Sequence, residues 1–205
     1  MKKLFLTSYF AGTVEAFKEF EKDNVEGKKV TFIPTAGNVE EYTGYIEEAR
    51  ELLAKMGYEV DSLDISSLDE KTLTNRILES HFLYVSGGNT FYLLQEIKRK
   101  NLVEVMRRMI ENGIPYVGES AGAIITAPNI EYNQLMDDKE KGNELKSYES
   151  LGIVNFYVVP HYKEFPFEES AELTLRTYKE KLALKPLNNS EAIIVIDNNC
   201  RVVGK

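Results

Sequence analysis

The 205-residue sequence contains one cysteine, two histidines and no tryptophan. The single cysteine, Cys200, excludes an internal disulfide and is typical of proteins from a reducing compartment. The two histidines, His81 and His161, are too few for an ordinary zinc site, which takes several His or Cys ligands. We therefore expect no metal and no cofactor.

Acidic residues outnumber basic ones, and long apolar runs are scarce. The formal net charge of −8, from 25 basic and 33 acidic side chains, argues against nucleic acid as the main partner. No stretch approaches the roughly 20 apolar residues of a membrane span, so no membrane partner is expected. The apolar run at residues 4–6 is shorter than the roughly 7–15 residues of a secretion signal. We interpret it as a first buried strand of a cytoplasmic protein.

Short apolar runs alternate with helical patterns along the chain, which is typical of a mostly parallel sheet with helices on both faces. Strands are predicted at residues 3–7, 30–34, 59–64, 82–86, 116–118, 154–160 and 192–196, with a hairpin at the C-terminus. Helices are predicted at residues 13–22, 39–56, 90–99, 102–112 and 168–182. Residues 1–205 are thus expected to form a single three-layer α/β domain.

The clearest predicted helix runs from residue 39 to 56. Its apolar residues recur at spacings of three and four and therefore share one face: Val39, Tyr42, Ile46, Ala49, Leu53 and Met56. Asn38 is expected to cap its start, and Gly57 to end it. Residues 129–151 lack such a pattern. We expect them to leave the sheet, as a hairpin for example, and to form one wall of a site.

The strongest chemical signal is the sequence Gly118-Glu119-Ser120-Ala121-Gly122, between an apolar strand and a helical stretch. A serine on such a sharp turn has a strained backbone, and small neighbours avoid collisions. The turn lifts the hydroxyl above the sheet, and the helix N-terminus offers free N–H groups to an oxyanion. Ser120 is therefore the candidate nucleophile on a strand-to-helix elbow. The alternative is a glycine-rich turn in which Ser120 caps the helix.

His161 is the candidate general base. It follows the apolar run 154–160, at the carboxyl end of a predicted strand, where reacting groups of α/β sheets gather. His81 stands at the beginning of a strand, which is the wrong edge of the sheet. The alternative for His161 is a structural histidine bonded to a loop carbonyl.

A second glycine turn, at residues 86–90, also joins a strand to a helix. Glycines let the backbone approach a ligand closely, so the Gly88 N–H can join the Ala121 N–H in an oxyanion hole. We assign Gly88, Asn89 and Ala121 to oxyanion and substrate binding. A phosphate-binding loop is a rival interpretation, but the chain has neither G-x-G-x-x-G nor a GK[ST] ending here. A tight structural turn capped by Asn89 is the other alternative.

Three stretches together resemble the peptidase E family of aspartyl dipeptidases and their cyanophycinase relatives. They are residues 84–91, 115–123 and 159–161, in the family's order and at compatible separations. The resemblance implies a fold similar to class I glutamine amidotransferases, with serine replacing their cysteine at the elbow. It also implies a Ser-His-acid triad and cleavage of short peptides with an acidic N-terminal residue.

The chain departs from aspartyl dipeptidases at two positions that bear on specificity. Those enzymes carry an Asp soon after the elbow, where an ungapped count reaches Leu135. They also carry an Arg soon after the histidine, thought to hold the substrate carboxylate, where this chain has residues 173–175 and Arg176 is out of step. We therefore expect no strong preference for aspartate.

The family's acidic triad member falls within residues 187–191. An ungapped match places Asn189 there, and Glu191 lies close by. A carboxylate stabilises an imidazolium better than an amide does. Glu191 is therefore the expected third member and Asn189 the alternative, with Glu119 and Glu164 next.

The sequence thus predicts a serine-type, dipeptidase-like peptidase whose substrate is a small peptide. His161 would take the Ser120 proton, and the N–H groups of Gly88 and Ala121 would receive the oxyanion. One alternative is another acyl hydrolase or transferase, acting on esters. The other is a non-catalytic binding relative whose triad has decayed. A homodimer is left open as the assembly.

Overall fold

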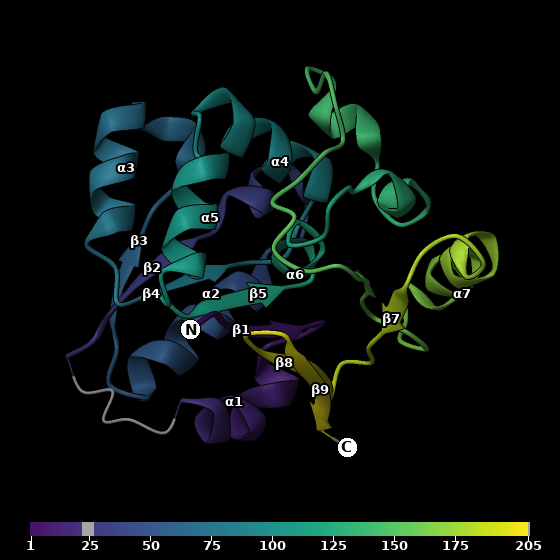
Figure 1. The fold of residues 1–205 in the computed structure, drawn as a ribbon, viewed down its shortest axis with the longest axis horizontal. Coiled ribbons are helices and arrows are strands. Elements are labelled where there is room, and N and C mark those ends of the chain that lie inside the picture. The colour runs from purple at the N-terminus through teal and green to yellow at the C-terminus, as the bar shows by residue number, and fades with distance from the viewer. Residues whose placement is uncertain (22–26, 205) are drawn as a thin grey trace.

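The computed structural model describes residues 1–21 and 27–204 and has a seven-stranded sheet at its centre (Figure 1). The strand order is β3-β2-β4-β5-β1-β8-β9. These strands are β1 (Lys3–Thr7), β2 (Lys29–Ile33), β3 (Glu59–Ser62), β4 (Phe82–Val85), β5 (Tyr116–Glu119), β8 (Glu191–Ile196) and β9 (Asn199–Gly204). The strands from β3 to β1 are parallel, whereas β8 pairs antiparallel with β1 and forms the predicted C-terminal hairpin with β9.

Two apolar layers hold the helices on opposite faces of this sheet. In β1, Leu4 and Leu6 belong to one layer and Phe5 to the other, and all three are fully buried. Strands buried on both faces have continuous apolar sequences, as this chain does. The helices over the Leu4 face are α3 (Glu70–Leu78), α4 (Thr90–Arg99), α5 (Val103–Glu111) and α6 (Ala121–Ile124), and those over the Phe5 face are α1 (Val14–Phe20) and α2 (Gly44–Lys55) (Figure 1). The predicted three-layer α/β fold is confirmed.

The longest helix begins later than the apolar spacing predicts. Helix α2 starts at Gly44, and Thr35–Val39 form a 3-10 helix, η2, before it. The Asn38 side chain donates hydrogen bonds to Asp64 and so is not the cap of α2. Tyr42 precedes the helix and is 73% exposed, although its spacing placed it on the buried face.

The strand predicted at residues 154–160 is shorter and lies outside the main sheet. Strand β6 (Tyr157–Val159) pairs in parallel with β7 (Leu184–Pro186) in a separate two-stranded sheet. Helix α7 (Glu168–Tyr178) joins them, and this unit stands beside the main sheet (Figure 1). Strand β7 was not predicted, because its three residues include a lysine and a proline and show no apolar run.

The irregular segment 129–151 differs from the hairpin that the sequence suggested. It contains the 3-10 helices η4 (Glu131–Leu135) and η5 (Lys139–Gly142) and a single bridge between its ends. Helix α4 packs against η5, so the segment covers the start of that helix. Residue 22, the predicted end of the first helix, lies outside the described residues. None of the described helices is long and apolar enough to cross a membrane.

Candidate active site

Ser120 lies at the junction of β5 and α6 in an unusual backbone conformation. Its φ of 46° and ψ of −105° fall outside the regions that non-glycine residues normally occupy. The Ser120 N–H donates to the Thr7 carbonyl at 2.8 Å, and the Ser120 carbonyl accepts from the N–H groups of Ala123 and Ile124, both at 2.9 Å. Bonds on both sides therefore hold the strained residue in place.

Two glycines allow the elbow to pack against the sheet. A Cβ on Gly118 would lie 2.5 Å from the Gly122 carbonyl oxygen, and one on Gly122 would lie 2.1 Å from the Val85 carbonyl oxygen. Both distances are far below van der Waals contact with backbone atoms that cannot move aside. The small residues on either side of Ser120 are therefore a steric requirement of the turn, as the sequence motif predicts.

His161 lies directly beside Ser120. Its Nε2 is 3.0 Å from Ser120 Oγ, and its Nδ1 is 2.8 Å from Asn189 Oδ1. Because the amide oxygen accepts from Nδ1–H, the bare Nε2 faces the serine hydroxyl. The ring stacks on Phe167 with centroids 4.7 Å apart. Burial lowers the pKa of His161 below its usual value, although the hydrogen bond with Asn189 and the charge of Glu164 act against this.

The residue behind the histidine is Asn189, and the expected contact with Glu191 is absent. Glu191 is the first residue of β8, and its Oε2 accepts from the Asn188 N–H at 3.0 Å, which closes the preceding turn. Glu164 lies closer to the ring, since its Oε1 accepts from the Asn189 N–H at 3.3 Å and its charge raises the pKa of His161. The ungapped position was therefore the correct guide to the contact.

The second glycine turn lies beside the serine. A Cβ on Gly87 would lie 3.3 Å from Ser120 Cβ and 3.3 Å from Tyr45 Cε2. Gly88 has a φ of 127°, and a Cβ on it would lie 2.3 Å from the Ala36 carbonyl group. Within residues 1–21 and 27–204, no protein group accepts a hydrogen bond from the N–H of Gly88 or Ala121. Neither amide is therefore bonded to another group in this part of the chain.

Asn89 has a structural task in this turn. Its Oδ1 accepts from the N–H groups of Phe91 and Tyr92 at 3.1 and 3.0 Å, and its Nδ2 donates to the Asp138 carbonyl. The side chain therefore caps α4 and ties it to the irregular segment. This contact set matches the alternative interpretation of Asn89 rather than the substrate-binding one.

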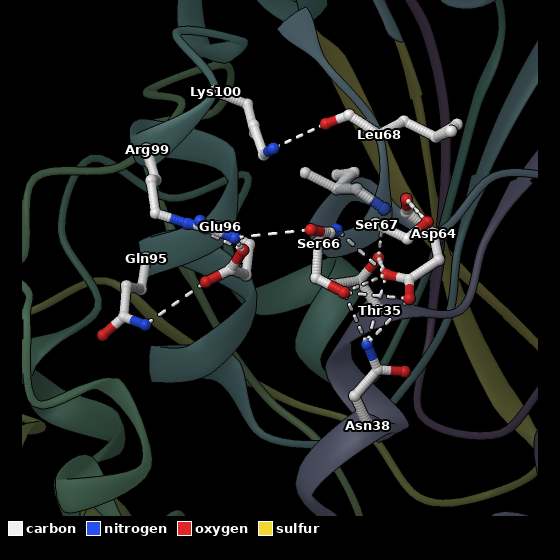
Figure 2. Close-up of polar contacts among 11 residues, drawn as sticks. Thr35, Asn38, Asp64, Ser66, Ser67, Leu68, Gln95, Glu96, Arg99 and Lys100 are labelled. Carbon is white, nitrogen blue, oxygen red and sulfur yellow. Dashed lines mark hydrogen bonds and ion pairs between the residues drawn. The ribbon is translucent and has the colours of Figure 1, made fainter.

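A polar cluster around Asp64 supports the turn from behind. Figure 2 shows Thr35, Asn38 and Ser66 converging on this carboxylate, with distances of 2.9–3.1 Å. Burial raises the pKa of Asp64, but these hydrogen bonds outweigh burial and hold the pKa below its usual value. The cluster fixes η2, and the Ala36 carbonyl in η2 accepts from the Asn89 N–H at 2.9 Å. The glycine turn therefore rests on an anchored backbone.

Two carboxyl groups lie near the site, the buried Glu119 and the half-buried Asp137. The sequence prediction gave neither a role, except Glu119 as a spare triad member. Burial raises the pKa of Glu119 to about 7 and that of Asp137 to about 6. Asp137 Oδ2 accepts from the Thr90 N–H at 2.8 Å and from Asn133 Nδ2 at 2.9 Å, so it also stabilises the start of α4. In the sequence, only the position of Glu119 directly before Ser120 indicated that one of these carboxyl groups lies near the site. In the described part of the chain, no group of three or more His, Cys, Asp or Glu residues is placed to hold a metal ion.

Comparison with known proteins places the chain in a family. Residues 4–203 match Peptidase family S51. The chain belongs to this family. A Pasteurella multocida relative, Uncharacterized peptidase PM1590, is 42% identical over 203 residues, which cover 99% of this chain and 97% of the relative. Peptidase E of a Nostoc species is 26% identical over 216 residues, covering 99% and 86%.

A crystal structure of a Listeria monocytogenes EGD-e protein, described provisionally as a peptidase E, superposes on this S51 chain with a TM-score of 0.96. It is 41% identical and covers 100% of this chain and 99% of that one. The resemblance to the peptidase E family is thus confirmed. The protein is a serine-type peptidase of family S51.

The packing of Gly88 leads to a first prediction. Gly88→Ala should lower the free energy of unfolding by at least about 3 kcal/mol, because the φ is strained for alanine and the new methyl group overlaps backbone. The matched control is Gly152→Ala: Gly152 also has a positive φ, 59°, but its Cβ would meet only an Arg107 side-chain nitrogen, at 3.9 Å. That change should cost about 1 kcal/mol. Urea unfolding of both variants measures the difference, and equal losses would contradict the steric argument.

Proposed function

We propose that this peptidase hydrolyses short peptides through a triad of Ser120, His161 and Asn189. The observation that carries the proposal is the continuous contact from Asn189 Oδ1 through the imidazole ring to Ser120 Oγ, with distances of 2.8 and 3.0 Å. The contact with Ser120 lies within the range in which a proton can be transferred, and the contact with Asn189 is a hydrogen bond that orients the ring. The name of the Nostoc relative, Peptidase E, supports a peptide substrate.

In the first half of the reaction, His161 Nε2 removes the Ser120 proton as Oγ attacks the peptide carbonyl carbon. The carbonyl oxygen becomes an oxyanion, which the free N–H groups of Gly88 and Ala121 receive. When the tetrahedral intermediate collapses, His161 gives its proton to the leaving amine, and an acyl-enzyme remains on Ser120. Water then attacks this ester with His161 again as base, which releases the acid and restores the serine.

Asn189 and Glu164 divide the task that one carboxylate has in most serine triads. The Asn189 oxygen fixes the ring tautomer but carries no charge to stabilise the imidazolium. The Glu164 carboxylate, which holds the Asn189 N–H, supplies negative charge nearby and raises the pKa of His161. Burial lowers the same pKa and dominates, so the base is neutral at neutral pH.

Covalent labelling tests the nucleophile. A fluorophosphonate should modify Ser120, and Ser120→Ala should abolish both labelling and peptide hydrolysis. The control is Ser66→Ala, at a serine in the Asp64 cluster, which should still be labelled. Peptide mapping by mass spectrometry locates the adduct. Stoichiometric modification at another residue, with Ser120 untouched, would sink the assignment.

Substitutions at the third position separate the two candidates. Asn189→Ala should lower kcat by about 100-fold or more, because the ring loses its orienting acceptor. Glu191→Gln should change kcat little, since Glu191 bonds to the Asn188 N–H and not to the ring. Asn189→Asp should keep activity and move its acid limb to higher pH, because a carboxylate raises the pKa of the base.

The direction of the pH dependence follows from the protonation of His161. His161 must be neutral to act, so activity is lost as pH falls through its folded pKa, which burial lowers from 6.5. If Glu191→Gln lowered kcat strongly and Asn189→Ala did not, Glu191 rather than Asn189 would be the third member of the triad. Kinetics from pH 4 to 9, with circular dichroism to show that each variant is folded, decide between them.

Charges near the serine argue against an acidic substrate side chain. The Tyr45 ring lies beside Gly87, which itself lies beside Ser120, and the pKa of Tyr45 is raised by burial and then by the nearby carboxylates Glu40 and Glu119. Arg176, the arginine out of step in the sequence, is exposed on α7. Like charges in such a site repel the substrate rather than hold it.

We therefore predict that kcat/KM for Asp-Leu exceeds that for the nearly isosteric Asn-Leu by less than about tenfold. Competition between the two dipeptides, followed by mass spectrometry of the free amino acids, measures the ratio directly. A preference for Asp-Leu above about a hundredfold would show that a cation reaches the substrate carboxylate.

A further inference from the structure

The carboxyl group of Glu119 connects three segments at the elbow. The side chain is 2% exposed, although it directly precedes the nucleophile. Its Oε1 accepts from the Phe10 N–H at 2.8 Å, and its Oε2 accepts from the Tyr84 hydroxyl at 2.9 Å. The backbone of Gly87 also bonds toward this carboxylate and lowers its pKa. One buried acid thus receives donors from the end of β1, from β4 and from the glycine turn.

Of these segments, residues 7–10 touch both reacting groups. The Thr7 carbonyl accepts from the Ser120 N–H at 2.8 Å. Ser8 Oγ accepts from the His161 N–H at 3.1 Å and donates to the Leu187 carbonyl at 2.9 Å. The bond from Phe10 to Glu119 fixes the far end of the same short segment. A shift of this segment would therefore move the nucleophile and the base relative to each other.

We propose that Glu119 is a positioning residue whose ionised carboxylate holds residues 7–10 and the glycine turn, so that the site acts at full rate only when Glu119 is deprotonated. This inference rests on the proposed roles of Ser120 and His161. Two backbone N–H groups and a hydroxyl face the carboxylate, and an ionised acid can accept from all three. A protonated acid must donate from one oxygen, which leaves fewer acceptors for these donors.

The groups around Glu119 place its titration near neutrality. Burial raises its pKa to about 7, against the hydrogen bonds from Phe10, Tyr84 and Gly87, and the charge of Glu48 on α2 adds to the rise. Tyr84, Tyr9 and Tyr45 also face this acid, and their pKa values lie above the range in which Glu119 titrates. None of these groups, all of which belong to the described part of the chain, is a cation that would keep Glu119 ionised in acid.

The predicted signature is a steep acid limb. Protonation of His161 removes the base, and protonation of Glu119 releases the segment, so both losses occur as pH falls. The second-order rate of fluorophosphonate labelling at Ser120 should therefore fall with a slope steeper than one in log rate per pH unit. Glu119→Gln, which like the protonated acid has one acceptor and one donor site, should reduce this slope to one. It should also lower the rate at high pH by about 10- to 100-fold, the effect of a small misplacement of reacting groups.

Tyr84→Phe provides a second test that leaves Glu119 in place. The variant keeps the Phe10 bond but removes a donor that lowers the pKa of Glu119. The Glu119 step should therefore move to higher pH while the steep slope remains. Labelling needs no knowledge of the substrate, and circular dichroism and urea unfolding show whether each variant is folded.

The outcomes separate this inference from the proposed function. Labelling at Ser120 with a slope of one in the wild type, or an unchanged profile in both variants, would overturn the role of Glu119 and leave Ser120 as nucleophile. Should Glu119→Gln not fold, an unmoved acid limb in Tyr84→Phe would overturn the role by itself. Absence of labelling at Ser120 in the wild type would overturn the proposed function and this inference with it.

Discussion

The close backbone contact between the elbow and strand β4 is the constraint on which the site depends. Gly122 packs so tightly on the Val85 carbonyl that any side chain there would overlap it. This contact, together with the bond from Ser120 to β1, sets the angle at which β5 turns into α6. A residue in such a conformation costs about 1–3 kcal/mol, which the buried strands on both sides offset. Because β5 lies at the centre of the sheet, its buried contacts offset the strain at Ser120.

The base and its partner come from outside this rigid centre. His161 and Asn189 follow the short strands β6 and β7, which form their own two-stranded sheet. His161 has a φ of 57°, so local propensity alone does not place its ring. Three other contacts hold the residue: the Ser8 hydroxyl accepts from its backbone N–H, and the Asn189 amide and the Phe167 ring contact its side chain. The proposed triad is thus assembled where these two parts of the fold meet, with residues 7–10 between them.

Sequence patterns predicted the parts of the structure that rest on local rules. Continuous apolar runs located the parallel strands, and the motif around Ser120 located the elbow, because both express steric demands that neighbouring residues must meet. The contact behind the His161 ring was predicted wrongly for the opposite reason, since Asn189 and not Glu191 makes it. These residues are two positions apart in one turn, and which one faces the ring depends on the register of β8 against β1. A general preference for carboxylates carries no information about that register.

Burial acts in opposite directions on the two titrating groups of the site. It lowers the pKa of His161, so folding favours the neutral base; this contribution to stability is present above pH 6.5 and is lost as pH falls through the folded pKa. It raises the pKa of Glu119 from 4.5 to about 7, so the folded chain binds more protons than the unfolded chain between these values. The Glu119 contribution is full below 4.5 and is lost as pH rises through about 7. The ionisation state that suits the reaction is therefore favoured by folding at His161 and opposed by it at Glu119. The hydrogen bonds from Phe10, Tyr84 and Gly87 lower the pKa of Glu119 and so act against the effect of burial.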